Sequence, residues 1–326
     1  MSEARAIRIH AAGGPEVMAL ETLALPPPGP GEVRLRQTAI GVNFIDCYHR
    51  SGLYPLPLPS GIGLEAAGVV EDVGPGVTGL AAGDRVAYCL TPIGSYASHR
   101  NYPADLLVKV PDGVTDEQAA SLMLQGLTAW FLLHRTYRVK AGETVLFHAA
   151  AGGVGLIACQ WARHLGVRLI GTAGSPEKAA LAREHGAAEV ILYRSEDVAA
   201  RVRALTDGKG VPVVYDSVGK DTWDGSLDSL AMRGLMVSFG NASGPVPPFS
   251  PGILAAKGSL YLTRPTLFHH IADKAERDEA AATLFDLVSS GIIRTNVRQH
   301  FALADAVAAH RALEARATVG STVLLP

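Results

Sequence analysis

The chain has 326 residues, of which 48% are hydrophobic and 18% are charged, and its formal net charge at pH 7 is -2. A chain of this length exceeds the size at which one hydrophobic core stops growing, so we expect a globular protein of two domains. The near-zero net charge excludes a strong electrostatic attraction to nucleic acid or to an anionic membrane.

The N-terminal part carries short β-type runs separated by turn residues. The runs cover residues 4–9, 32–40, 67–73 and 85–89, with proline- and glycine-rich turns such as 26–31. This pattern predicts a compact, mostly β domain over residues 1 to about 120, without a parallel sheet. The charged first residues lack the apolar core of a signal peptide, and we expect a cytoplasmic protein.

A glycine-rich turn follows the short apolar run 145–147, which is suited to a buried parallel strand. Gly152, Gly153 and Gly155 allow the backbone to approach a pyrophosphate at the N-terminus of the next helix. Ala150 stands at the first glycine position of G-x-G-x-x-G, so an ordinary tight turn explains the cluster about equally well when it is considered alone.

The neighbouring segments favour the dinucleotide site over the ordinary turn, because strands and helices alternate for more than a hundred residues. This alternation predicts an α/β fold with a doubly wound parallel sheet, whose strand ends face one ligand crevice. The predicted strands are 168–173, 189–193, 211–218, 235–240 and 259–264, with helices from Pro176, at 196–206 and at 220–231. The loops expected to face the ligand are 149–155, 173–178, 216–219 and 239–243.

The C-terminal segment contains a helix from Ala275 to near Gly291, a strand at 297–301, a helix at 304–314 and a closing strand at 321–325. We expect these elements to return to the first domain.

The residues after the second strand of the series favour NADP over NAD. Ala173 stands where an NAD site usually carries an acidic residue for the ribose, so no carboxylate repels a 2′-phosphate. Ser175 offers a hydroxyl and Lys178 a positive charge. Ser175 can equally be a helix N-cap before Pro176, with a solvated Lys178, and both interpretations can hold together. Tyr193 can lie against the adenosine or simply pack.

The three cysteines, Cys47, Cys89 and Cys159, are widely spaced and form no C-x-x-C pair. They predict neither a disulfide framework nor a four-cysteine zinc site. We expect no bound metal.

Six stretches of the chain resemble the zeta-crystallin-like NADPH:quinone oxidoreductases of the medium-chain dehydrogenase/reductase superfamily, and the resemblance covers the whole chain. It implies a Rossmann NADPH-binding domain at 125–265 and a mostly β, GroES-like catalytic domain formed by 1–124 and 266–326. Zinc alcohol dehydrogenases of this superfamily carry a cysteine ligand within the segment here occupied by 43–46, and a G-H-E where this chain has Gly63-Leu64-Glu65. The six stretches are 43–46, 50–55, 61–68, 81–86, 148–155 and 215–219.

The same resemblance implies a site for NADPH and an acceptor in the interdomain cleft. The pocket facing C4 of the nicotinamide would be formed by Asn43, Tyr48, Tyr54 and Thr128, of which Asn43 and Thr128 also contact the cofactor. Tyr48 and Tyr54 can stack on a planar acceptor or donate a proton, and we favour stacking because a hydroquinone can take protons from water. The other implied cofactor contacts are Gly152, Gly153, Val154, Gly155, Ser175, Lys178, Tyr193, Ser217, Phe239, Gly240, Asn241, Thr263, Arg264 and Arg316.

Three functions are consistent with these residues. The first is an NADPH-dependent quinone reductase that transfers a hydride or electrons without a metal. The second is a 2-alkenal or enone double-bond reductase, which an apolar, metal-free pocket also suits. The third is a nucleotide-binding structural or RNA-interacting protein, against which the lack of a basic cluster argues. We expect a small-molecule quinone substrate, no nucleic acid, no membrane, and a homodimer that pairs through the apolar strand 258–263.

Overall fold

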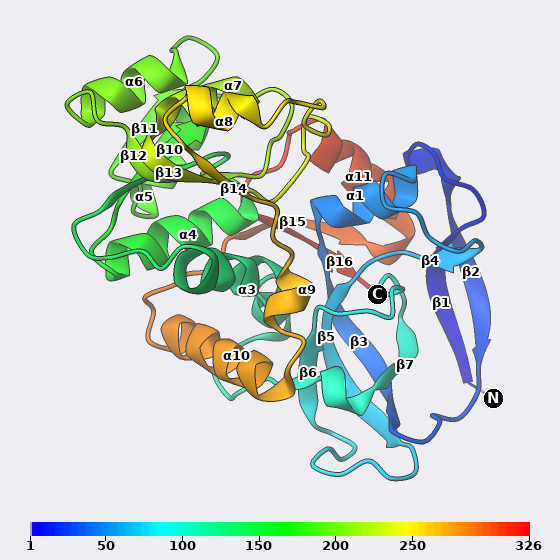
Figure 1. Ribbon diagram of the computed structural model, residues 1–326. Coiled ribbons are helices and arrows are strands. Elements are labelled where there is room, and N and C mark those ends of the chain that lie inside the picture. The colour runs from blue at the N-terminus through cyan, green and yellow to red at the C-terminus, as the bar shows by residue number, and fades with distance from the viewer. Residues whose placement is uncertain (1) are drawn as a thin grey trace. The chain divides into compact units, whose positions relative to one another are not determined.

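The computed structural model describes residues 2–326, which form two compact units (Figure 1). The first unit comprises Met1–Gln125, Asp273–Ser290 and Thr295–Pro326, and the second comprises Gly126–Ala272 and Gly291–Arg294. Each unit has its own hydrophobic core. Within residues 2–326, no helix combines the length and the apolar character needed to cross a membrane.

The second unit is built on a six-stranded sheet in the order β11-β10-β9-β12-β13-β14, in which every pair is parallel. This order confirms the predicted doubly wound α/β fold, with the strand order reversing between β9 and β12. The strands are β9 (Thr144–Phe147), β10 (Arg168–Ala173), β11 (Glu189–Leu192), β12 (Val211–Asp216), β13 (Leu230–Ser238) and β14 (Tyr261–Thr263).

Helices cover both faces of this sheet: α4 and α5 lie on one side, and α6 and α7 on the other (Figure 1). Sequence-local caps begin two of them, since Ser175 accepts a hydrogen bond from the Lys178 amide and Asp197 accepts one from the Ala200 amide. The helices are α4 (Gly153–His164), α5 (Pro176–Glu184), α6 (Val198–Leu205), α7 (Trp223–Ser229), α8 (Gly252–Ala256) and α9 (Leu267–His270), while α3 (Met123–Phe131) begins at the end of the first unit's opening segment.

The first unit contains a three-stranded sheet, β2-β1-β4, and a seven-stranded sheet in the order β15-β16-β3-β5-β6-β8, with β7 also paired to β3. All pairs among the N-terminal strands are antiparallel, as predicted for residues 1 to about 120. The strands are β1 (Ser2–Ile9), β2 (Met18–Leu25), β3 (Glu32–Val42), β4 (Ser60–Gly61), β5 (Glu65–Val73), β6 (Arg85–Tyr88), β7 (His99–Pro103) and β8 (Val108–Lys109).

Most of the C-terminal segment belongs to the first unit, through Asp273–Ser290 and Thr295–Pro326. Strand β16 (Ser321–Leu325) pairs antiparallel with β3, and β15 (Val297–Ala302) pairs parallel with β16. Helices α10 (Lys274–Ser289) and α11 (Ala306–Glu314) belong to the same unit. This return adds a parallel pair to an otherwise antiparallel sheet.

Two short helices of the first unit were not predicted. Helix α1 (Phe44–Ser51) begins after Asn43, where the Asp46 carboxylate accepts a hydrogen bond from the Asn43 amide, and α2 (Asp116–Ala120) has Thr115 as its N-cap. Helix α1 buries polar residues such as Asp46 and Arg50. Its apolar residues Phe44, Ile45 and Tyr48 are only half-buried, so the apolar side of this helix does not lie in the core.

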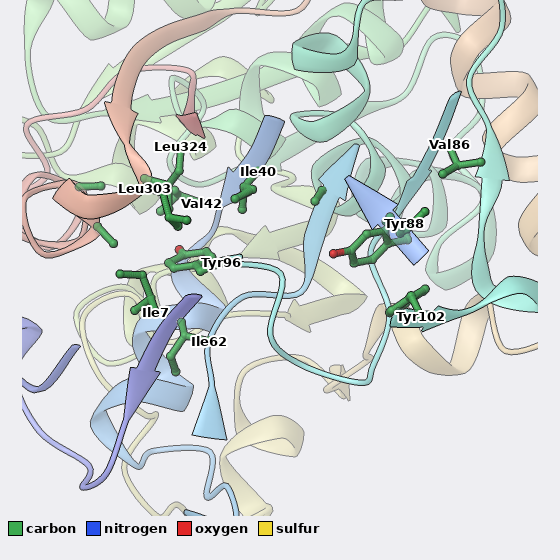
Figure 2. Close-up of a cluster of buried hydrophobic side chains, with 14 of the residues drawn as sticks. Ile7, Ile40, Val42, Ile62, Val86, Tyr88, Tyr96, Tyr102, Leu303 and Leu324 are labelled. Carbon is green, nitrogen blue, oxygen red and sulfur yellow. The ribbon is translucent and has the colours of Figure 1, made fainter. Parts of the chain in front are cut away.

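The core of the first unit contains tyrosines among aliphatic side chains (Figure 2). Tyr96 lies close to Val42 and Ile62, and its side chain is fully buried. Its hydroxyl donates to Asp46 Oδ2 at 3.0 Å and lies 3.0 Å from His310 Nε2. The core thereby ties α1 to α11.

Candidate cofactor and acceptor sites

The glycine turn after β9 brings backbone very close to the start of α4. Gly152 is the N-cap of this helix, and a Cβ on Gly155 would lie 2.5 Å from the Ala149 carbonyl oxygen and 2.7 Å from Ala150 Cα. Ala149 has a φ of 54°, a left-handed conformation that is uncommon without glycine. This tight approach leaves the helix N-terminus, with Gly153 and Val154 in its first turn, suited to an anion such as a pyrophosphate.

The loops after β12 and β13 pack closely against each other. A Cβ on Gly240 would lie 2.5 Å from the Ser217 carbonyl oxygen. One orientation of the Asn241 side-chain amide gives both of its polar atoms a partner. In it, the nitrogen donates to the Gly240 carbonyl at 2.9 Å and the oxygen accepts from Arg264 Nη2 at 3.2 Å. Arg264 Nη1 also donates to the Ser238 carbonyl at 2.8 Å.

Four of the predicted contacts, Ser217, Gly240, Asn241 and Arg264, are therefore brought together at these loops. Thr263, the last residue of β14, is paired with Val237, and the Phe239 ring lies 5.8 Å from the Phe147 ring.

The residues expected to select the 2′-phosphate lie after β10 and β11. Ser175 Oγ accepts the Lys178 amide at 3.3 Å, which makes Ser175 the N-cap of α5. A Cβ on Gly174 would lie 2.5 Å from the Tyr193 hydroxyl oxygen, so the half-exposed Tyr193 ring reaches over this turn. Ala173 is buried at the strand end, and no acidic side chain replaces it.

Asn43 lies in a buried hydrogen-bond chain in the first unit. Its Nδ2 donates to Glu65 Oε2 at 2.7 Å, and its Oδ1 accepts from Gln125 Nε2 at 3.0 Å. Ser321 Oγ on β16 donates to Gln125 Oε1 at 2.7 Å, and the Leu124 amide donates to Glu65 Oε1 at 2.7 Å. The chain fixes which end of the Asn43 amide faces each neighbour.

Two buried carboxyl groups lie near Asn43, and burial is the main influence on both. Burial raises the pKa of Glu65 to about 8, against the opposing effect of the hydrogen bonds from Leu124 and Asn43. Burial likewise raises the pKa of Asp46 to about 7, although the backbone N–H of Asn43 and the Tyr96 hydroxyl donate hydrogen bonds to this carboxyl group. The charge state of this region therefore changes near neutral pH.

Tyr48 and Tyr54 are half-buried, and their rings form an edge-to-face pair with centroids 5.2 Å apart. The backbone supports this pair, because the Tyr54 amide donates to the Tyr48 carbonyl at 3.1 Å. Tyr48 and Tyr54, both expected to contact the quinone, thus lie together. Asn43 is the N-cap of the helix that carries Tyr48.

Two further predicted residues lie on other elements. Thr128 is buried on α3 in the second unit, and Arg316 follows α11 in the first unit with a φ of 56°.

Sequence reasoning missed Glu65 and Gln125 as functional residues. In the sequence, Glu65 stands out only as part of the altered zinc motif. Its position as a charged residue within an apolar stretch is the one further feature that could have indicated a buried polar role. Gln125 lies 82 residues from Asn43 in the chain and carries no local pattern.

The donor groups at these positions do not suit zinc. Asn43 presents an amide, Leu64 is fully buried, and both Glu65 oxygens accept hydrogen bonds. Among residues 2–326, no group of three or more His, Cys, Asp or Glu side chains could hold a metal ion. All three cysteines are free and buried, and burial raises the pKa of each thiol, that of Cys159 to about 12.

Two family models match the chain. The alcohol dehydrogenase GroES-like domain matches residues 29–112, and the zinc-binding dehydrogenase matches residues 153–285.

Close relatives match over nearly the whole length. The chain is 59% identical over 325 residues to a quinone oxidoreductase of Pseudomonas aeruginosa, with 99% of this chain and 100% of that protein covered. It is 50% identical over 326 residues to a 2-haloacrylate reductase of a Burkholderia species, with 98% of each covered. The crystal structure of Escherichia coli quinone oxidoreductase complexed with NADPH matches with a TM-score of 0.98 at 52% identity, covering 99% of this chain and 100% of that one. The predicted family is confirmed: the chain belongs to the quinone oxidoreductases of the medium-chain dehydrogenase/reductase superfamily.

Proposed function

We propose that this protein is an NADPH-dependent quinone reductase. The observation that carries the proposal is the glycine turn, in which Gly155 has no room for a side chain and the N-terminus of α4 follows a parallel strand. The residues present fit the cofactor, because this turn suits a pyrophosphate and no acid stands at Ala173. When bound, NADPH supplies the hydride or electrons that reduce the acceptor.

The second unit is assigned the cofactor. Backbone of the turn, including Gly152, would hold the pyrophosphate, and Ser175 and Lys178 would hold the 2′-phosphate beside Tyr193. The loops around Ser217 and Asn241 would hold the nicotinamide end. The remaining assigned contacts are Gly153, Val154, Phe239, Gly240, Thr263 and Arg264, together with Thr128, Asn43 and Arg316.

The first unit is assigned the acceptor. The edge-to-face pair of Tyr48 and Tyr54 would present an aromatic surface to a planar quinone, and we assign these rings to stacking rather than to proton transfer. Asn43 would offer its amide in an orientation set by Glu65 and Gln125. These residues orient and desolvate the acceptor, which needs no covalent intermediate with the protein.

Catalysis is proposed to be metal-independent, because an amide and an alkyl side chain, Asn43 and Leu64, occupy the positions of the zinc ligands in related alcohol dehydrogenases. Turnover should survive prolonged chelation, and elemental analysis should find no stoichiometric zinc. Loss of turnover on chelation, followed by recovery with zinc, would contradict this assignment.

A second function is favoured by one comparison, the 50% identity to a 2-haloacrylate reductase. An activated alkene, like a quinone, accepts a hydride without a Lewis acid. Turnover of 1,4-benzoquinone against 2-haloacrylate and 2-alkenals decides between them, since the preferred substrate will have the higher kcat/KM.

The proposal includes a cytoplasmic homodimer without a nucleic-acid partner. Exposed apolar side chains on β13 and β14, Met232 and Tyr261, are 75% and 61% exposed and favour pairing with a second copy. Free, buried cysteines suit a reducing compartment. Sedimentation tests whether the protein is a homodimer. A filter-binding assay with RNA at physiological salt tests whether it binds nucleic acid.

Cofactor choice gives the decisive test of the main proposal. NADPH should bind about tenfold to over a hundredfold more tightly than NADH, because a charge-assisted contact contributes roughly 1.5 to 3 kcal/mol. Lys178→Ala should narrow this difference, whereas Lys209→Ala in the loop before β12 should leave it unchanged. Equal affinity of the unmodified protein for both nucleotides would refute the cofactor assignment.

A further inference from the structure

Four polar side chains lie buried beneath the glycine turn of the second unit. His148 follows β9, Thr172 lies on β10, Asp216 ends β12 and Ser226 lies on α7, and none is more than 2% exposed. Burying polar groups is unfavourable unless each finds a partner. Their hydrogen bonds therefore need a complete account.

Asp216 is the acceptor at one end of this cluster. Its Oδ1 accepts from the amides of Val218 at 2.7 Å and Gly219 at 3.0 Å, and its Oδ2 accepts from Thr222 Oγ1 at 2.7 Å and Ser226 Oγ at 2.8 Å. Four donors on two oxygens match a carboxylate, which accepts at both oxygens and donates from neither. Asp216 thus fixes the start of the loop that contains Ser217.

The remaining hydrogens have only one consistent direction. Ser226 has a single hydroxyl hydrogen, which it donates to Asp216, so it can only accept from His148 Nε2 at 2.9 Å. His148 Nδ1 is then an acceptor for the Thr172 hydroxyl at 3.1 Å, and Thr172 Oγ1 accepts the Ala149 amide at 3.2 Å. Burial lowers the pKa of His148, which favours the neutral ring, and the partners of the two nitrogens place its single proton on Nε2.

This chain of hydrogen bonds runs from the Ala149 amide to the Asp216 carboxylate and joins two segments assigned to NADPH. At one end, Ala149 holds the left-handed φ of 54° that opens the glycine turn, a conformation that is unfavourable for an L-residue. At the other end, Asp216 holds the amides of Val218 and Gly219. Within such a network each bond strengthens the next.

We propose that this chain, through Thr172, His148 and Ser226, is a positioning device that presets the glycine turn and the loop at Ser217 for NADPH. The inference rests on the proposed function. None of the three side chains needs to touch the cofactor, so they are positioning residues. Their effect should be confined to the pyrophosphate and nicotinamide portions, because the hydrogen bonds of the chain do not include Ser175 or Lys178.

Nitrogen NMR of the histidines in the ligand-free protein tests the chain directly. His148 should show a protonated Nε2 and an unprotonated Nδ1 across neutral pH, and a His148→Gln variant assigns its resonances. A ring protonated on Nδ1 would reverse the direction of the bonds and overturn the proposal.

Substitutions at Thr172 test the effect on binding. Thr172→Val keeps the shape of the side chain but removes the hydroxyl, and it should raise the Kd of NADPH about tenfold, corresponding to roughly 1.4 kcal/mol. Thr172→Ser keeps the hydroxyl and should restore most of the affinity. Adenosine 2′-monophosphate, which carries the 2′-phosphate but neither the pyrophosphate nor the nicotinamide, should bind all three proteins equally, and Thr283→Val on α10 should behave like wild type.

The controls separate the possible failures. If wild type itself fails to bind NADPH, the proposed function is wrong; if wild type binds and Thr172→Val binds equally well, the positioning role is wrong. An equal loss of affinity for both ligands would indicate general damage to the fold and also overturn the proposal. Should Thr172→Val not fold, Ser226→Ala breaks the same chain from α7, with the same expected difference between the two ligands.

Discussion

The glycine turn of the second unit and the surroundings of Asn43 in the first unit both lie at strand ends, yet they are built by different means. Backbone shapes the turn: neighbouring residues approach so closely that Gly155 tolerates no Cβ. Side chains shape the Asn43 site, because Asn43 is hydrogen-bonded to Glu65 and Gln125, which lie 22 and 82 positions further along the sequence. A site made of backbone accepts a constant group such as a pyrophosphate, whereas a site made of side chains can vary with the acceptor.

The largest expected effect is at the backbone site. Gly155→Ala places a Cβ 2.5 Å from the Ala149 carbonyl oxygen, so the turn must open, and the Kd of NADPH should rise about a hundredfold. Gly225→Ala on α7 is the matched control, because a Cβ there would meet nothing within 4 Å. Fluorescence titration of both variants, with circular dichroism to check folding, measures the difference; wild-type affinity in Gly155→Ala would show that backbone does not shape this site.

The side-chain site should respond in the acceptor parameters. Gln125→Met leaves Asn43 Oδ1 and Ser321 Oγ without their buried partner, which costs about 1 to 2 kcal/mol and should lower kcat/KM for 1,4-benzoquinone about tenfold. Gln299→Met is a close control, since Gln299 also accepts a hydrogen bond from β16, through Thr322, but does not hold Asn43. A change in the Kd of NADPH larger than the change in kcat/KM would mean that Asn43 serves mainly the cofactor.

Stacking and proton donation by Tyr54 predict different results. Tyr54→Ala should raise the KM for the quinone about fivefold, because a ring contact contributes roughly 0.5 to 1.5 kcal/mol, while Tyr54→Phe keeps the ring and most of the turnover. Steady-state kinetics with a quinone and a 2-alkenal compare both variants, and the same pair of substitutions applies to Tyr48. A loss of about a hundredfold in the Phe variant would instead identify an obligatory proton donor.

The smallest expected effect is on stability and its dependence on pH. The folded-state pKa of Glu65 lies near 8, above its ordinary value of 4.5, so the folded protein keeps a proton that the unfolded chain has lost, and stability decreases as the pH rises between these values. Glu65→Gln removes this slope and should gain about 1 kcal/mol relative to wild type between pH 6 and pH 7. Urea unfolding at both pH values measures it, with Glu279→Gln on the exposed face of α10 as control; a constant difference between wild type and Glu65→Gln would show that Glu65 does not titrate there.

Local patterns explain how much of the fold could be predicted. Strand β10 and strand β16 have the predicted bounds, and α5 begins at Pro176 after the predicted cap, because apolar runs and caps act over a few residues. The family motifs likewise located the glycine turn at the start of α4. The polar neighbours of Asn43 could not be predicted, since Glu65 and Gln125 meet it only after distant segments fold together. Helix α1 was missed because it is short and buries polar side chains.

The buried cysteines have a consequence for the chemical durability of the protein. Quinones alkylate thiolates, and an enzyme that handles them is exposed to its own substrate throughout its life. Here every thiol is enclosed, with a pKa raised by burial, so the reactive anion is scarce at neutral pH and out of reach of the electrophile. The protein can thereby handle a quinone as substrate while its own sulfur atoms stay protected from alkylation.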